Sequence, residues 1–259
     1  MQRGHAPGRP PSRLADAAVK ARAEEQVANR LARPTGSISD ALVSLEGPHF
    51  VLPKTNCIFD NAFAGCSSMV TIDLPTSLAS IGARAFHSCH ALCRVRLPDS
   101  VTLLGPKAFC NCTGLSDVQL PANLQSICES TFEGCVALTH LQLPDKLVSI
   151  GVGAFAGCST LSCIELPATL HSIQGSAFAG CKVLCSVAVP ALLEQAELRE
   201  IGIGAFHGCP SLDVASRDAI GRLACGRGRL RAFAHPPPVV ERELLDLNMV
   251  QMRARVAAK

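Results

Sequence analysis

Tryptophan and tyrosine are both absent from this chain of 259 residues, and phenylalanine supplies its entire aromatic content of 4%. Trp and Tyr, together with Arg, contribute most of the binding energy at ordinary protein interfaces. Aromatic rings also stack on the bases in many proteins that bind single-stranded nucleic acid. A binding surface on this chain must therefore consist of other side chains.

Long apolar segments are absent as well. No stretch reaches the roughly 18 consecutive apolar residues that indicate a transmembrane helix. Residues 1–10 are basic and rich in Pro and Gly, but the apolar segment of about 7–15 residues that defines a secretory signal does not follow them. We therefore expect no transmembrane segment and a cytoplasmic location.

Charged residues make up only 17% of the chain, and the net charge of +3 is unevenly distributed. Residues 1–35 contain seven Lys or Arg and three acids, residues 217–259 contain nine and four, and residues 36–216 contain eight and fourteen. A nucleic-acid-binding domain normally collects positive charge on one face, because phosphate neutralisation supplies the affinity. The acidic centre leads us to expect no nucleic-acid partner.

A motif built on phenylalanine recurs through this acidic centre. Six phenylalanines lie 23 residues apart and a seventh follows after 28, each with a small residue before it and a cysteine three residues after it. Such a fixed period predicts a repeat architecture. The phenylalanines are Phe63, Phe86, Phe109, Phe132, Phe155, Phe178 and Phe206, and the cysteines are Cys66, Cys89, Cys112, Cys135, Cys158, Cys181 and Cys209.

A Leu-Pro pair marks a second position of the repeat, as the unit at residues 135–151 illustrates. Leu141 to Leu143 alternates apolar and polar residues, which is the period of a strand, and Pro144 ends that strand because it has no N–H to donate. Leu147 and Ile150 then return to the core on the far side. Gly151 allows a bend where a side chain would clash.

A single unit of 23 residues cannot bury its own leucines, but stacked units cover each other. Strands of successive turns then pair in parallel, about 4.8 Å apart. We expect a curved solenoid with one ribbon-like sheet. Residues 1–47 form a basic arm and an N-terminal cap with a helix over 13–33, residues 48–212 form seven repeats with a bulge at 191–198, and residues 213–259 form a partly helical C-terminal cap with helices over 213–233 and 241–258.

The pattern Leu-x-x-Ile/Val-x-Leu-Pro-x-x-Leu-x-x-Ile-Gly-x-x-Ala-Phe-x-Gly-Cys closely resembles the BspA-like leucine-rich repeats, also called the Treponema pallidum type, over residues 50–212. The resemblance implies an α/β class, right-handed leucine-rich-repeat solenoid whose parallel strands line a concave face. It also implies non-enzymatic protein binding without a cofactor. Many relatives are surface proteins that attach to host matrix proteins or to other cells, so an exported adhesin is the alternative.

The concave face is the predicted site for a protein or peptide partner, because the residues that flank each inward strand residue face solvent and are not needed for the core. Arg94 and Arg96 would form a positive point next to the acids Asp73 and Asp117. An ordinary solvated face without a ligand is the alternative. The candidate residues are Thr71, Asp73, Arg94, Arg96, Asp117, Gln119, His140, Gln142, Cys163 and Glu165, followed by Ser186 and Ala188.

The fourteen cysteines are predicted to be free thiols or metal ligands rather than a disulfide framework, because the chain shows no secretory signal. The seven at the repeat position have a structural explanation. A thiol is small and easily buried, and it can donate weakly to a carbonyl of the neighbouring turn.

Two arrangements could instead indicate chemistry. His87, Cys89, His90 and Cys93 are residue types that zinc prefers, but Cys89 should point inward, so we expect no metal site. The second arrangement lies on the predicted binding face.

On that face His140 lies beside Cys163 of the next turn, with Asp117 and Glu165 near them, and this pair could act as an activated nucleophile. A shallow exposed ribbon supplies neither an oxyanion hole nor exclusion of water. We therefore expect no catalytic residues.

Overall fold

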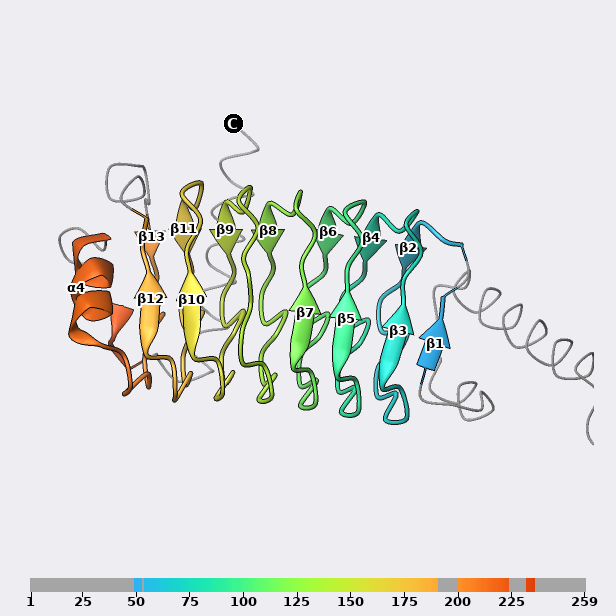
Figure 1. The fold of residues 1–259 in the computed structure, drawn as a ribbon, viewed down its shortest axis with the longest axis horizontal. Helices are drawn as coiled ribbons and strands as arrows, with labels where there is room; N and C mark the ends of the chain where they lie inside the picture. The colour runs from blue at the N-terminus through green and yellow to red at the C-terminus, as the bar shows by residue number, and fades with distance from the viewer. Residues whose placement is uncertain (1–48, 53, 191–199, 224–231, 236–259) are drawn as a thin grey trace, which may run out of the picture.

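The protein is described here by a computed structural model, which covers residues 49–52, 54–190, 200–223 and 232–235. In Figure 1 the chain winds as a stack of short turns, each lying alongside the turn before it. The predicted N-terminal arm, the helix over 13–33, the bulge at 191–198 and the helix over 241–258 lie outside these residues.

One side of the stack carries a row of three-residue strands, which we call the first ladder (Figure 1). All of its pairs are parallel, for example Arg94 with Asp117. The strands form two sheets, in the orders β1-β3-β5-β7 and β10-β12. They are β1 (His49–Val51), β3 (Thr71–Asp73), β5 (Arg94–Arg96), β7 (Asp117–Gln119), β10 (Cys163–Glu165) and β12 (Ser186–Ala188).

The first ladder is interrupted at the strand predicted for Leu141 to Leu143. Only an isolated bridge between His140 and Cys163 joins this turn to the next, although Leu141 and Leu143 are both buried as expected. The turns on either side place a β-branched residue at the centre of the strand, such as Val118. Branching at Cβ favours extended backbone, and Leu141 is not branched there. The prediction of a regular strand over Leu141 to Leu143 was wrong.

A second row of strands, the second ladder, runs along another side of the stack (Figure 1). Its two-residue strands pair in parallel in the sheet orders β2-β4-β6 and β13-β11-β9-β8. The expectation of a single sheet was therefore wrong. The strands are β2 (Cys57–Ile58), β4 (Ser80–Ile81), β6 (Leu103–Leu104), β8 (Ser126–Ile127), β9 (Ser149–Ile150), β11 (Ser172–Ile173) and β13 (Glu200–Ile201).

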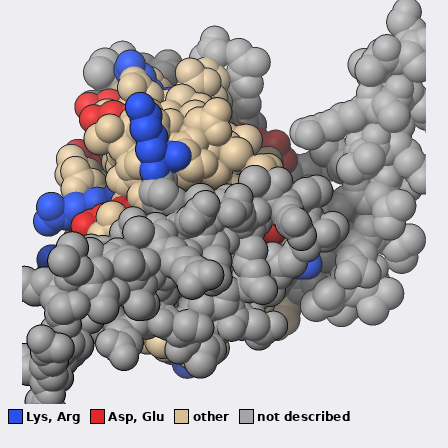
Figure 2. Space-filling model, turned by 90° about the vertical axis from the view of Figure 1, so that its right-hand side faces the viewer, with Lys and Arg blue, Asp and Glu red and all other residues tan. Residues whose placement is uncertain are grey.

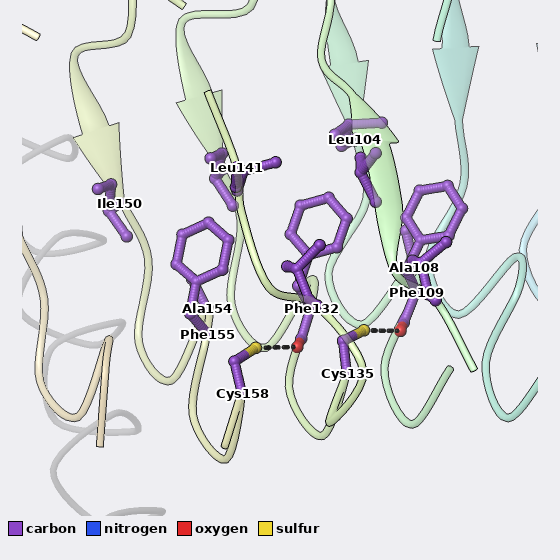
Figure 3. Packing of buried hydrophobic residues seen from close by; sticks show 14 of the residues in the cluster. Leu104, Ala108, Phe109, Phe132, Cys135, Leu141, Ile150, Ala154, Phe155 and Cys158 are labelled. Carbon is purple, nitrogen blue, oxygen red and sulfur yellow. Dashed lines mark hydrogen bonds between the residues drawn. The ribbon is translucent and has the colours of Figure 1, made fainter. Parts of the chain in front are cut away.

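The seven repeat phenylalanines form one internal row between Phe63 and Phe206. Each ring stacks on the next with centroids 5.0–5.6 Å apart and interplanar angles of 3–11°, within the range of favourable aromatic pairs. Figure 3 shows three of these rings side by side. All seven are fully buried, which confirms that the turns share one apolar interior.

The repeat cysteines line this interior, and the thirteen cysteines of the described residues are free thiols. From Cys89 to Cys209, each repeat thiol donates to the carbonyl oxygen of the repeat phenylalanine in the preceding turn, at 3.0–3.3 Å. Cys89, for example, donates to Phe63. Figure 3 shows this bond for Cys135 and for Cys158. Burial raises the pKa of the Cys158 thiol to about 12, so it remains protonated and able to donate. The predicted bond to a neighbouring turn is confirmed.

Gly151 is required by the close approach of adjacent turns. A Cβ atom at this position would lie 2.7 Å from the carbonyl carbon of Cys128 and 2.7 Å from the amide nitrogen of Glu129. Both are backbone atoms, so neither can rotate away. The predicted clash is confirmed, and the second ladder can stack closely because the residue after β9 has no side chain.

Helix α4 (Val214–Leu223) follows the seventh repeat. Asp213 caps its first turn, because an Asp213 carboxylate oxygen accepts from the Ser216 amide at 2.6 Å. The Ser216 hydroxyl in turn accepts from the amide of Val187 in β12 at 2.9 Å. The helix therefore satisfies a donor on the exposed edge of the first ladder. α4 lies within the range predicted for the C-terminal cap, whose other segments, 224–231 and 236–259, fall outside the described part.

A further Ala-Phe pair, Ala232-Phe233, adds an eighth phenylalanine to the row. The Phe206 amide donates to the Ala232 carbonyl at 2.9 Å, and the Phe233 ring lies 6.3 Å from that of Phe206, tilted by 38°. These two residues were predicted to belong to the C-terminal cap, and their repeat character was not predicted. The dipeptide itself was the available signal.

Candidate protein-interaction surface

The first ladder presents the predicted candidate residues on its outer side. In β5, β7 and β10 the central residue is buried and both flanking residues are exposed. In β3, Thr71 is half-buried and Asp73 is exposed. His140 and Gln142 are exposed as well, although their turn has no regular strand. The outward placement is confirmed, whereas the binding role stays a prediction.

At the β1 end of the ladder, His49 connects two candidate residues. Its Nδ1 atom lies 2.6 Å from the Thr71 hydroxyl oxygen and its Nε2 atom lies 3.1 Å from a carboxylate oxygen of Asp73. His49 is not among the candidate residues predicted from the sequence. Its position in the incomplete first repeat, three residues before Leu52, was the signal that could have found it.

Arg94 and Arg96 differ in their surroundings although they share one strand. The Arg94 Nε atom lies 2.8 Å from a carboxylate oxygen of Asp117, and both side chains are more than half exposed. Such exposed pairs contribute only about 0–1 kcal/mol to stability. Arg96 makes no ion pair with any residue in the described ranges. Of the two arginines predicted to form a positive point, only Arg96 therefore keeps a positive charge that no acid within the described ranges neutralises.

Arg96 lies at an open groove of about 480 Å³ at the ends of β3, β5 and β7. Its lining combines apolar and polar side chains: Leu74, Thr76, Arg96, Leu97, Pro98, Asp99, Ser100 and Gln119. The groove is open to solvent rather than enclosed, which suits a segment of another chain better than a small molecule.

The charged residues near this end are mixed rather than segregated. Figure 2 views the stack from the β1 end, and the visible Lys and Arg side chains of the described residues are interspersed with Asp and Glu. A mixed surface of this type suits a protein partner more than the uniform negative charge of a nucleic-acid backbone.

The predicted proximity of His140 and Cys163 is confirmed, with Nδ1 and Sγ 3.7 Å apart. The Ser162 hydroxyl lies 3.9 Å from the same sulfur. Both residues of the pair are exposed. Water therefore reaches the thiol freely, and the arrangement lacks the enclosed, water-free surroundings of a catalytic nucleophile.

The residues considered for a zinc site make separate contacts instead of converging on one point. The Cys89 thiol is buried and donates to the Phe63 carbonyl, whereas His87 Nδ1 lies 3.1 Å from the Cys110 carbonyl oxygen. His90 Nδ1 lies 3.2 Å from the Thr113 hydroxyl oxygen. Within the described ranges, no group of three or more His, Cys, Asp or Glu side chains is arranged to hold a metal ion.

The part of the chain that the structure describes contains no helix of sufficient length and apolar character to span a bilayer. The cytoplasmic location expected from the sequence stays a prediction.

Comparison with known proteins points to repeat proteins of bacteria. A family model described as "BspA type Leucine rich repeat region", with six copies, matches residues 44–162 and 106–217. Among curated proteins, none matches this sequence.

Solved structures give the same result. A leucine-rich repeat protein from Eubacterium ventriosum is 26% identical with a TM-score of 0.59, over 64% of this chain and 44% of that chain. The T. pallidum Leucine Rich Repeat protein is 26% identical with a TM-score of 0.47, over 73% of this chain and 87% of that chain. The match therefore spans less than half of the Eubacterium protein.

Proposed function

Because the chain belongs to the BspA-type leucine-rich-repeat family, we propose that it is a non-enzymatic scaffold that binds another protein or peptide through the exposed face of the first ladder. The right-handed winding and concave curvature of that ladder, which the family resemblance implies, are part of the proposal. The scaffold needs no cofactor.

The observation that carries the proposal is the alternation of buried and exposed residues within the strands of the first ladder. Val95 is fully buried, whereas its neighbours Arg94 and Arg96 are exposed. The same division recurs in β7 and β10. The fold therefore constrains the central residue and leaves the flanking residues free, and such freely variable positions on a rigid support favour recognition.

Charge reversal tests this face. We expect Arg94→Glu combined with Arg96→Glu to weaken binding to a partner captured by the wild-type chain by at least about tenfold, because like charges across an interface are repulsive. The affinity of the purified partner would be measured by calorimetry. The unfolding midpoint should change little, since both side chains are exposed.

A matched control carries the same change in net charge away from the first ladder. Arg84→Glu combined with Lys146→Glu replaces two cations that follow or precede strands of the second ladder, and both residues are exposed. We expect this variant to bind as the wild type does. Equal affinity of all three proteins, or loss only in the control, would contradict the proposed face.

A further inference from the structure

We propose that the groove beside Arg96 recognises a carboxylate, carried by an Asp or Glu side chain next to an apolar residue in an extended segment of the partner. This inference rests on the proposed function and specifies the chemistry of the partner.

The first support is the state of the charges at this end of the ladder. Asp73 is bound to His49 at 3.1 Å and Arg94 is bound to Asp117 at 2.8 Å. Arg96 is the remaining charged side chain of β3, β5 and β7, and it has no ion-pair partner within the described ranges. An arginine that lines a groove without a counter-ion favours an anionic group.

The second support is the direction of the remaining hydrogen bonds. Asp99 is occupied, because one of its carboxylate oxygens accepts from the Ala122 amide at 3.0 Å. The Ser100 hydroxyl donates to the Leu78 carbonyl at 2.6 Å. Asp99 and Ser100, which line the groove beside Arg96, therefore already make hydrogen bonds within the fold.

The Thr76 hydroxyl and the Gln119 amide, by contrast, make no side-chain hydrogen bond to the residues that the structure describes. Both groups can donate, as can the guanidinium of Arg96. A ligand that accepts several hydrogen bonds and carries one negative charge complements these three donors, and a carboxylate has both properties.

The same surroundings favour a carboxylate over a phosphate. A phosphate carries about two negative charges near neutral pH, but the groove holds a single unpaired cation and contains the carboxylate of Asp99. Asp73 adds a second acid one turn away from Arg96. The apolar lining by Leu74, Leu97 and Pro98 accommodates an apolar residue beside the carboxylate.

Synthetic heptapeptide pools test the inference. The central position would be fixed as Glu, Gln or phosphoserine, with randomised flanks that include Leu and Val, and retention of the purified full chain would be measured on each pool. We expect about tenfold more retention on Glu than on Gln, as a hydrogen-bonded charge typically gives. Arg96→Gln should abolish this preference, and Gln119→Ala should reduce it.

Arg84→Gln is the matched control, because it removes an exposed arginine charge away from the first ladder and should leave the Glu preference unchanged. Equal retention on Glu and Gln, a stronger preference for phosphoserine, loss of the preference in Arg84→Gln instead of Arg96→Gln, or no retention on any pool would overturn the inference. These results leave the proposed function standing as long as the double charge reversal still weakens the captured partner.

Discussion

Both ladders are built from parallel strands, but they expose different chemistry. The outer residues of the second ladder are mostly serine, at Ser80, Ser126, Ser149 and Ser172. Two of them contact each other across a turn, with the hydroxyls of Ser149 and Ser126 3.0 Å apart. The outer residues of the first ladder instead change type from turn to turn. The comparison indicates that stacking restricts the inner columns to apolar residues and that the outer residues vary more along the first ladder than along the second.

The shared core should be the largest contributor to the stability of both ladders. We expect Phe132→Ala to destabilise the chain by about 3–5 kcal/mol, because it removes a buried ring from the stack and leaves a cavity. Urea unfolding would measure the loss. Val136→Ala, at an exposed position of the same turn, is the control. A Phe132→Ala effect no larger than that of the control would show that the ring row does not hold the ladders together.

The close approach of adjacent turns should make the second-largest contribution to the free energy of unfolding, mainly through the second ladder. We expect Gly151→Ala to cost about 1–3 kcal/mol, because the new methyl group overlaps the backbone of the preceding turn. Gly157→Ala is the matched control: its Cβ would meet no atom closer than 3.8 Å, so its cost is the strain of a φ of +72° alone.

Hydrogen exchange would locate the damage from Gly151→Ala. Faster exchange in β8 and β9 with unchanged exchange in the first ladder would sharpen the distinction between the ladders. No measurable cost of Gly151→Ala would contradict close backbone approach as the reason for glycine at position 151.

The buried thiols beneath both ladders predict a smaller, pH-dependent effect. Burial raises the pKa of Cys158 from 9.0 to about 12. Below pH 9 the thiol is protonated in both the folded and the unfolded chain, and its contribution is fully present. Between pH 9 and 12 only the unfolded chain loses the proton, so the free energy of unfolding falls by up to about 1.4 kcal/mol per pH unit.

Urea unfolding from pH 8 to 11 would measure this slope. We expect Cys158→Val to show a shallower decline than the wild type, because one buried thiol no longer titrates, while the titration of lysines is common to both proteins. Identical slopes would mean that Cys158 ionises equally well in the folded chain.

The sequence predicted the inner columns because burial restricts them to apolar residues at a fixed period. Phe132, Cys135 and Leu138 could therefore be placed without coordinates. The second ladder was not predicted, because two residues such as Ser149 and Ile150 are too short to show a strand period.

The candidate face was predicted only in outline. Alternation identified Arg94 and Arg96 as outward residues, but the choice of Arg94 as the partner of Asp117 depends on side-chain conformations that a sequence does not record. The final aromatic, Phe233, was missed because the helix α4 separates it from the seventh repeat and alters the period.

The difference between the two ladders is tested most directly by site-specific photo-cross-linking. A photoreactive residue would be placed at Gln119 or Gln142 on the first ladder and, in matched variants, at Ser126 on the second ladder and Val136 in the connecting loop, all of them exposed. Binding through the first ladder predicts cross-links to the captured partner from Gln119 and Gln142 alone. Cross-links only from Ser126 or Val136 would contradict the assignment of the binding face.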